Sequence, residues 1–135
     1  MLHPLPALVV CLALILYFVL AGQVGWARGK FNVAAPAITG HPEFERIFRV
    51  QQNTLESLIM FLPGMWLFSQ YVSGVWAAAI GALWLIGRIL YAVAYRADAA
   101  RRGPGFGISA LASAVLVLGA LVGAAMALVG GGNYI

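Results

Sequence analysis

The chain has 135 residues, of which 63% are hydrophobic and only 9% are charged, and its mean hydropathy is +0.94. A soluble domain carries roughly 25% charged residues, so this composition excludes a water-exposed surface and predicts an integral membrane protein. The formal net charge is +4, but the few basic residues sit among apolar segments and form no basic stripe, which excludes a nucleic-acid partner.

Four apolar segments predict four membrane-spanning helices in a single domain, an all-α bundle. The predicted spans cover about residues 5–27, 42–70, 75–96 and 108–129 of a domain that extends over residues 1–135. The first is too long for the core of a cleaved signal peptide. The second has a polar first half and an apolar second half, which Pro63 should kink. In the fourth, Gly119 and Gly123 allow close helix packing, and we expect this helix to serve packing only.

The distribution of basic residues predicts the orientation in the membrane. With four spans, all eight fall at one side, in or near the first and third loops: Arg28, Lys30, Arg46, Arg49, Arg88, Arg96, Arg101 and Arg102. The positive-inside rule then places these loops in the cytoplasm and both termini outside. Short loops favour a bacterial inner membrane. His3, His41 and Cys11 lack metal-ligand spacing, so no metal is expected.

Two polar stripes predict a functional site, because ionisable residues at membrane depth are costly. The stripes consist of Arg49, Asn53 and Glu56 on the second span and Arg88, Tyr91 and Tyr95 on the third. One interpretation is a structural ion pair of Glu56 with Arg49 or Arg88. The other is an anionic ligand, since the arginines outnumber the nearby carboxylates. The amide, carboxylate and hydroxyl groups favour a zwitterionic, peptide-like ligand over a simple phosphate.

The segment from Pro42 to Asn53, followed by Glu56, resembles the signature of the membrane-associated proteins in eicosanoid and glutathione metabolism (MAPEG). The resemblance continues through residues 87–91, Tyr95 and the basic loop, and is closest to the branch of microsomal glutathione transferase 2 and leukotriene C4 synthase. It implies a MAPEG-like homotrimer of four-helix subunits, with glutathione bound as co-substrate between neighbouring subunits.

The resemblance also implies roles for single residues. Contacts to glutathione are carried over to Arg49, Asn53, Glu56, Tyr91 and Tyr95, with Arg28 and Gln51 reaching in from the adjacent subunit. Arg102 matches the arginine that activates the thiol, although Arg101 lies beside it, and Arg88 matches an arginine near the pocket. Three positions depart from the branch: Ser57 replaces a tyrosine ligand, Gly29 replaces an arginine, and the helix-two proline falls at Ile59, one turn before Pro63.

These features together predict a membrane-bound glutathione transferase for detoxification. Its thiolate would attack a hydrophobic electrophile from the bilayer lipid, or reduce a lipid hydroperoxide as a glutathione peroxidase. Two alternatives stay open. A non-catalytic lipid-binding protein of the MAPEG fold would not bind glutathione in a calorimetric titration. A small proton-coupled exporter would use a carboxylate in its first span, and residues 5–27 contain none.

Overall fold

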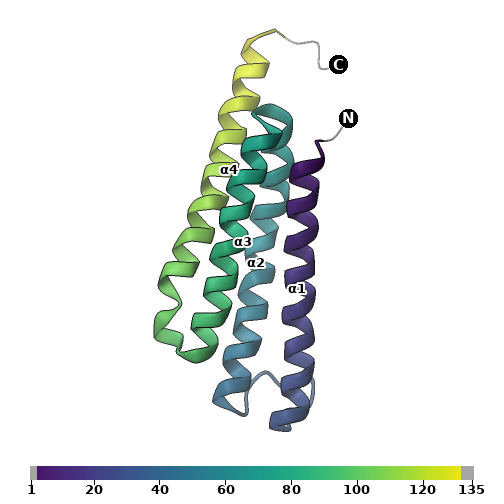
Figure 1. Cartoon of the computed structure of the whole chain (residues 1–135), viewed down its shortest axis with the longest axis vertical. Helices are drawn as coiled ribbons and strands as arrows, with labels where there is room; N and C mark the ends of the chain where they lie inside the picture. The colour runs from purple at the N-terminus through teal and green to yellow at the C-terminus, as the bar shows by residue number, and fades with distance from the viewer. Residues whose placement is uncertain (1–2, 132–135) are drawn as a thin grey trace.

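The computed structural model describes residues 3–131, and these form four long α-helices (Figure 1). The helices are α1 (Pro4–Phe31), α2 (Pro42–Tyr71), α3 (Gly74–Ala97) and α4 (Gly103–Val129), with a short 3-10 helix η1 (Ala99–Arg101) between α3 and α4. Each of the four predicted spans falls within one helix. The all-α prediction is therefore confirmed for the described part of the chain.

Side chains next to the helices fix where three of them begin. His3 Nδ1 accepts a hydrogen bond from Leu5 N at 3.2 Å, and His41 Nδ1 accepts one from Glu43 N at 3.1 Å. Ser73 Oγ does the same for Trp76 N at the start of α3. Such caps satisfy N–H groups that have no partner within the helix. The two histidines thus have a structural role at helix starts.

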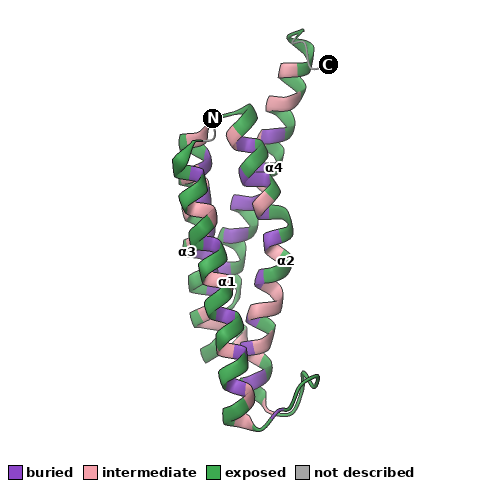
Figure 2. Cartoon of the chain, turned by 90° about the vertical axis from the view of Figure 1, so that its right-hand side faces the viewer, coloured by how far each residue is buried: buried purple, intermediate pink, exposed green. Residues whose placement is uncertain are grey.

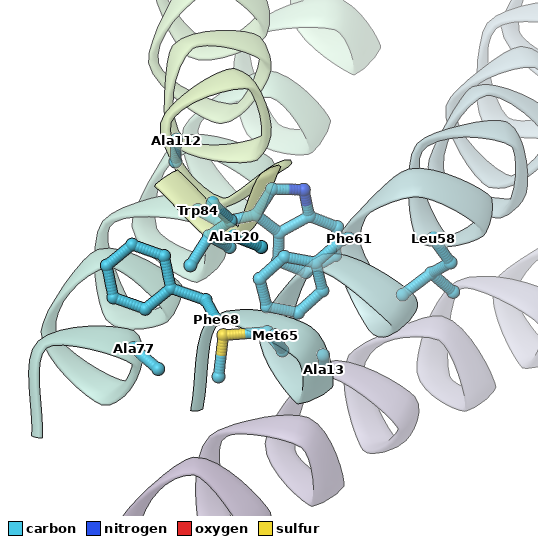
Figure 3. Packing of buried hydrophobic residues seen from close by; sticks show 10 residues of the cluster. Ala13, Leu58, Phe61, Met65, Phe68, Ala77, Trp84, Ala112 and Ala120 are labelled. Atoms are coloured by element: carbon cyan, nitrogen blue, oxygen red, sulfur yellow. The ribbon is translucent and has the colours of Figure 1, made fainter. Parts of the chain in front are cut away.

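The largest apolar cluster joins all four helices and draws most of its large side chains from the second half of α2 (Figure 3). Phe61 of α2 and Trp84 of α3 stack with ring centroids 4.0 Å apart and planes inclined by 8°. Met65 fills the space beneath them and is fully buried. The expected close approach of α4 is confirmed, because a Cβ at Gly123 would lie 2.7 Å from the carbonyl oxygen of Tyr71. The backbones of α4 and the end of α2 therefore pack directly against each other at Gly123.

The outward-facing surfaces of the helices are mostly exposed, and their inward-facing surfaces are buried (Figure 2). The exposed residues include many large apolar ones, whereas one arginine is buried. Phe18 is 82% exposed and Ile59 69% exposed, whereas Arg88 is completely buried. In water this distribution would be strongly unfavourable, but lipid accepts the apolar surface. By length and composition, α1, α3 and the segment 99–129 can each cross a membrane. The polar first half keeps α2 out of this group, so its crossing stays a prediction.

The two ends of the bundle along its long axis differ in charge: one end is basic and the other is uncharged. Figure 1 shows α2 and α3 lying between α1 and α4, with the start of α1 and the end of α4 at the same end. The α1–α2 loop and the α3–α4 connection lie at the opposite end, where α1 and α2 extend beyond the connection. With 30 residues, α2 is about 45 Å long, which exceeds the roughly 30 Å hydrocarbon core. If α2 crosses the membrane as predicted, its charged first turns would extend past the level of the hydrocarbon.

Candidate functional site

A polar cavity of about 270 Å³ lies between α2, α3 and α4. It brings together the predicted site residues Asn53, Glu56 and Arg88, and it includes Ser57. The full lining consists of Asn53, Glu56, Ser57, Met60, Arg88, Phe106, Ser109, Ala110 and Ser113. The polar side chains face a space that opens on the α2–α4 side of the bundle, so a ligand there would meet hydrogen-bonding groups from three helices.

Arg88 is the organising residue of the polar cavity. Its Nη1 donates to Asn53 Oδ1 on α2 at 2.9 Å, and its Nε donates to Ser109 Oγ on α4 at 3.1 Å. The guanidinium also lies over the ring of Tyr91, with Cζ 4.3 Å from the centroid. One buried side chain on α3 thereby connects all three walls of the cavity.

The proposed structural ion pair is not formed in this chain. Within residues 3–131, no arginine or lysine nitrogen lies within 4.0 Å of a carboxylate, and Glu56 is exposed at the mouth of the cavity. Arg88 is instead held by neutral oxygen atoms. Its positive charge is therefore uncompensated by any described carboxylate, which favours an anionic group in the adjoining space.

The contribution of α4 was missed by the sequence analysis, which expected only packing from this helix. Ser109 receives a hydrogen bond from Arg88 and donates one to Phe106 O at 3.0 Å. Ser113, one turn further on, has a buried hydroxyl oxygen without a hydrogen-bond partner and lines the same cavity. These serines are spaced i, i+4 in an otherwise apolar or glycine-rich helix, and that signal could have revealed a polar face.

Ser57 faces both the cavity and the core. Its Oγ accepts a hydrogen bond from Trp84 Nε1 at 3.0 Å, which satisfies the only polar atom of the buried indole. The serine hydroxyl retains its own proton for a second partner. Ser57, which replaces the tyrosine of the family pattern, thus has a structural role as the hydrogen-bond acceptor of Trp84.

A second cavity of about 260 Å³ holds two further predicted residues, Arg49 and Tyr95. It lies at the basic end and is otherwise lined by Ile38, Thr39, Glu45, Arg46 and Phe48. We call it the basic-end cavity. The polar stripes of α2 and α3 are thus divided between two cavities within one chain. Tyr91 links them, because its ring lies under Arg88 and 5.4 Å from the ring of Tyr95.

The two adjacent arginines of the α3–α4 connection are both exposed. Arg102 Nη1 donates to Ala99 O at 2.8 Å, and its Cζ lies 5.9 Å from the centroid of the Tyr95 ring. No such contact with a described site residue is found for Arg101. The structure therefore brings Arg102, and not Arg101, next to the tyrosine pair.

Arg28 and Gln51 lie on the α1–α2 side of the bundle, apart from the polar cavity. Gln51 Nε2 donates to the hydroxyl of Tyr17 on α1 at 2.7 Å. Arg28 Nη1 donates to Ala37 O at 2.7 Å, and its Cζ lies 5.0 Å from the ring centroid of Phe44. Neither residue lines the polar cavity of its own chain. Among the described residues, no three His, Cys, Asp or Glu side chains gather as metal ligands would.

Comparisons with known proteins agree with the resemblance. The model of the MAPEG family matches residues 6–122. An uncharacterized protein of Synechocystis sp. is 53% identical over 117 residues, which is 87% of this chain and 85% of that protein. Human microsomal glutathione S-transferase 2 is 44% identical over 78% of this chain and 71% of its own length. Rat leukotriene C4 synthase is 35% identical over 87% of this chain and 78% of its own length.

Proposed function

This chain belongs to the MAPEG family, and from that premise we propose that it is a membrane-bound glutathione transferase. Its relatives include microsomal glutathione S-transferase 2 and leukotriene C4 synthase, which are glutathione-dependent enzymes. The observation that carries the proposal is the polar cavity, in which a buried arginine without a carboxylate partner lies beside an amide and an exposed carboxylate. A carboxylate of glutathione would pair with the arginine, and its ammonium group would pair with the exposed carboxylate.

Arg102 is the residue that we propose for activation of the thiol. A thiol has a pKa near 8.5 and attacks only as the thiolate, so a nearby fixed positive charge increases its reactive fraction. Arginine stays protonated at all relevant pH values, which makes it a charge donor and not a base. The place of Arg102 above the Tyr95 ring supports this role, because its one internal hydrogen bond leaves most guanidinium donors available.

The second substrate in this proposal is a hydrophobic electrophile, or a lipid hydroperoxide, that arrives from the bilayer. An apolar cavity of about 450 Å³ between α2 and α4 supports this source. It shares Met60 with the polar cavity and continues along Pro63 and Leu121. The thiolate sulfur would form a bond to the electrophilic carbon while the leaving group departs with the electron pair.

We further propose that the enzyme is a homotrimer in which the site is completed by a neighbouring subunit. Arg28 and Gln51 lie on the α1–α2 side, whereas the polar cavity opens on the α2–α4 side. A ring that packs one side against the other would bring these residues to the cavity of the next subunit. The basic end would face the cytoplasm of a bacterial inner membrane.

The test compares two neighbouring arginines. We expect Arg102→Ala to retain most of the glutathione affinity and to lose the ultraviolet absorbance of the bound thiolate together with conjugation activity. Arg101→Ala removes the same charge one residue away, and we expect it to keep the thiolate signal. Thiolate absorbance and calorimetric affinity are measured on the purified protein. Unchanged turnover in Arg102→Ala would remove this residue from the mechanism, and failure of the native protein to bind glutathione would refute the proposed function.

A further inference from the structure

A groove between α1 and α3 shares no lining residue with the polar cavity and lies on another side of the bundle. It has a volume of about 190 Å³. Most of its wall is aliphatic, including Val19 and Leu20 of α1 and Ile89 and Val93 of α3. Its polar lining consists of Gln23 and Arg96. The groove therefore combines an apolar wall with two polar side chains.

Two cations meet on one exposed aromatic ring beside this groove. Trp26 is 52% exposed, and its ring centroid lies 4.9 Å from Lys30 Nζ and 5.6 Å from Arg96 Cζ. Lys30 comes from the end of α1 and Arg96 from the end of α3. Within residues 3–131, neither cation has a carboxylate partner within 4.0 Å. Two like charges are thus held against one indole ring, and neither has a described carboxylate partner.

The place of this cation pair is fixed by the fold. Arg46 Nε of α2 donates to the backbone oxygen of Arg96 at 3.1 Å, which ties the end of α3 to α2. The ring of Phe31 also lies beside Lys30, with its centroid 5.4 Å from Nζ. The Arg46 bond limits the freedom of the α3 end, so less conformational entropy is lost when an anion binds.

We propose that the α1–α3 groove binds a phospholipid with an anionic headgroup. The phosphate would lie between Lys30 and Arg96, the indole of Trp26 at the level of the headgroup, and an acyl chain against the aliphatic wall. Gln23, about one turn before Trp26 on α1, would offer an amide donor to an ester carbonyl. Basic pockets between transmembrane helices bind anionic headgroups in this way, and tryptophan favours the membrane interface. A free phosphate would leave the aliphatic wall uncovered, so the lipid is the occupant that fits the whole groove. The site is independent of glutathione.

The test is native mass spectrometry of the purified protein after addition of phosphatidylglycerol or phosphatidylcholine with identical chains. We expect the anionic lipid to be retained at least tenfold better than the zwitterionic one. Lys30→Gln with Arg96→Gln should abolish this preference. The single variants Arg96→Gln and Arg101→Gln form a matched pair, because each removes one exposed charge at the basic end. We expect Arg96→Gln to weaken the preference and Arg101→Gln to keep it.

Three results would overturn the proposal: equal retention of the two lipids by the native protein, an equal loss in Arg96→Gln and Arg101→Gln, or displacement of the lipid by glycerol phosphate. The last result would show that the cations bind a phosphate and that the groove contributes nothing. Circular dichroism of each variant distinguishes lost binding from lost folding, and Trp26→Leu, which keeps both cations, should weaken retention without abolishing it.

Discussion

At the scale of single residues, the most consequential feature is a buried cation whose partners are neutral. Arg88 is fully buried and gives hydrogen bonds to Asn53 and Ser109. Removing a guanidinium from water is costly, and neutral oxygen atoms offset that cost only in part. A charged group of a ligand in the polar cavity would offset more of it. Because the desolvation cost of Arg88 is only partly offset in the free protein, an anion that binds beside it gains additional favourable free energy.

Two substitutions at the Arg88–Ser109 hydrogen bond should have different effects. Arg88→Lys keeps the charge but lacks the planar fork that reaches Asn53 and Ser109 together. We expect it to weaken glutathione binding about tenfold, which equals about 1.4 kcal/mol, because Asn53 loses its fixed orientation. Ser109→Ala keeps the bond to Asn53, so it should lower the melting temperature while leaving the affinity within about twofold.

Isothermal titration and thermal unfolding in the same detergent measure the two effects separately. The informative result is whether each variant changes mainly the glutathione affinity or mainly the melting temperature. Equal losses of affinity in both variants would show that Arg88 supports the fold and does not position Asn53.

The polar residues illustrate what a sequence reveals at this scale. Helical spacing correctly places Asn53 and Glu56 at one cavity, because residues three or four positions apart share a face. It does not reveal which neighbouring helix supplies the partner of Arg88. That partner depends on how α4 is rotated, and the apolar composition of α4 contains little signal beyond its two serines. The division of Arg49 and Glu56 between two cavities likewise follows from packing between helices.

At the scale of elements, the crossing of α3 and α4 depends on two glycines. A Cβ at Gly105 would lie 2.7 Å from Tyr91 Cα and 2.8 Å from Gly87 O. A Cβ at Gly87 would in turn lie 2.8 Å from Ser109 N. Backbone therefore meets backbone at this crossing, which brings Ser109 within reach of Arg88. The close approach is thus a condition for the polar cavity.

We predict that Gly105→Ala destabilises the protein and that Gly107→Ala does not. At Gly105 the added methyl group meets backbone that cannot turn aside, and such overpacking costs about 1–3 kcal/mol. At Gly107, two residues further on in the same helix, nothing lies within 4 Å of the added atom. Alanine should therefore be neutral or slightly stabilising there through its higher helix propensity. Melting temperatures measure the difference, and equal values would refute the tight crossing.

Helix ends were less predictable than helix existence, for physical reasons. Hydropathy marks the part of a helix that lies in lipid, whereas the helix itself continues until its hydrogen bonding stops. In α1 that point is Asn32, which adopts a left-handed conformation with φ 53° after the polar last turn. Pro104 precedes the predicted span of residues 108–129, yet it lies in the first turn of α4, where its missing N–H has no partner to lose.

At the scale of the whole molecule, the two sides of α2 offer complementary surfaces for assembly. One side faces α1 and holds Gln51, and the other faces α4 and opens the polar cavity. Between them, Arg49 and Glu56 are exposed in the polar half of the helix. In a subunit ring, neighbouring subunits would cover these groups and keep them away from lipid. Charged side chains that faced lipid would be energetically costly. The proposed trimer thus accounts for polar exposure that a monomer in lipid would tolerate poorly.

The trimer predicts that two inactive variants restore activity when they assemble together. Arg102→Ala removes the proposed activating charge, and Arg28→Gln removes the charge that the adjacent subunit is proposed to supply. In a closed head-to-tail ring of three that contains both kinds of subunit, one site always combines an intact Arg102 with an intact Arg28 from its neighbour. We therefore expect mixed trimers, isolated through two different affinity tags, to show about one third of the native activity.

The control is the mixture of separately purified variants, which should stay inactive. Glutamine is chosen at position 28 because it removes the charge but keeps a polar side chain with an amide donor. If both residues served a site within one chain, no mixed trimer would contain an intact site and activity would not return. Full activity of Arg28→Gln by itself would show that the neighbouring arginine is not needed. Recovery in the mixed trimers alone would establish that the site forms between subunits, because no other arrangement unites the two intact side chains.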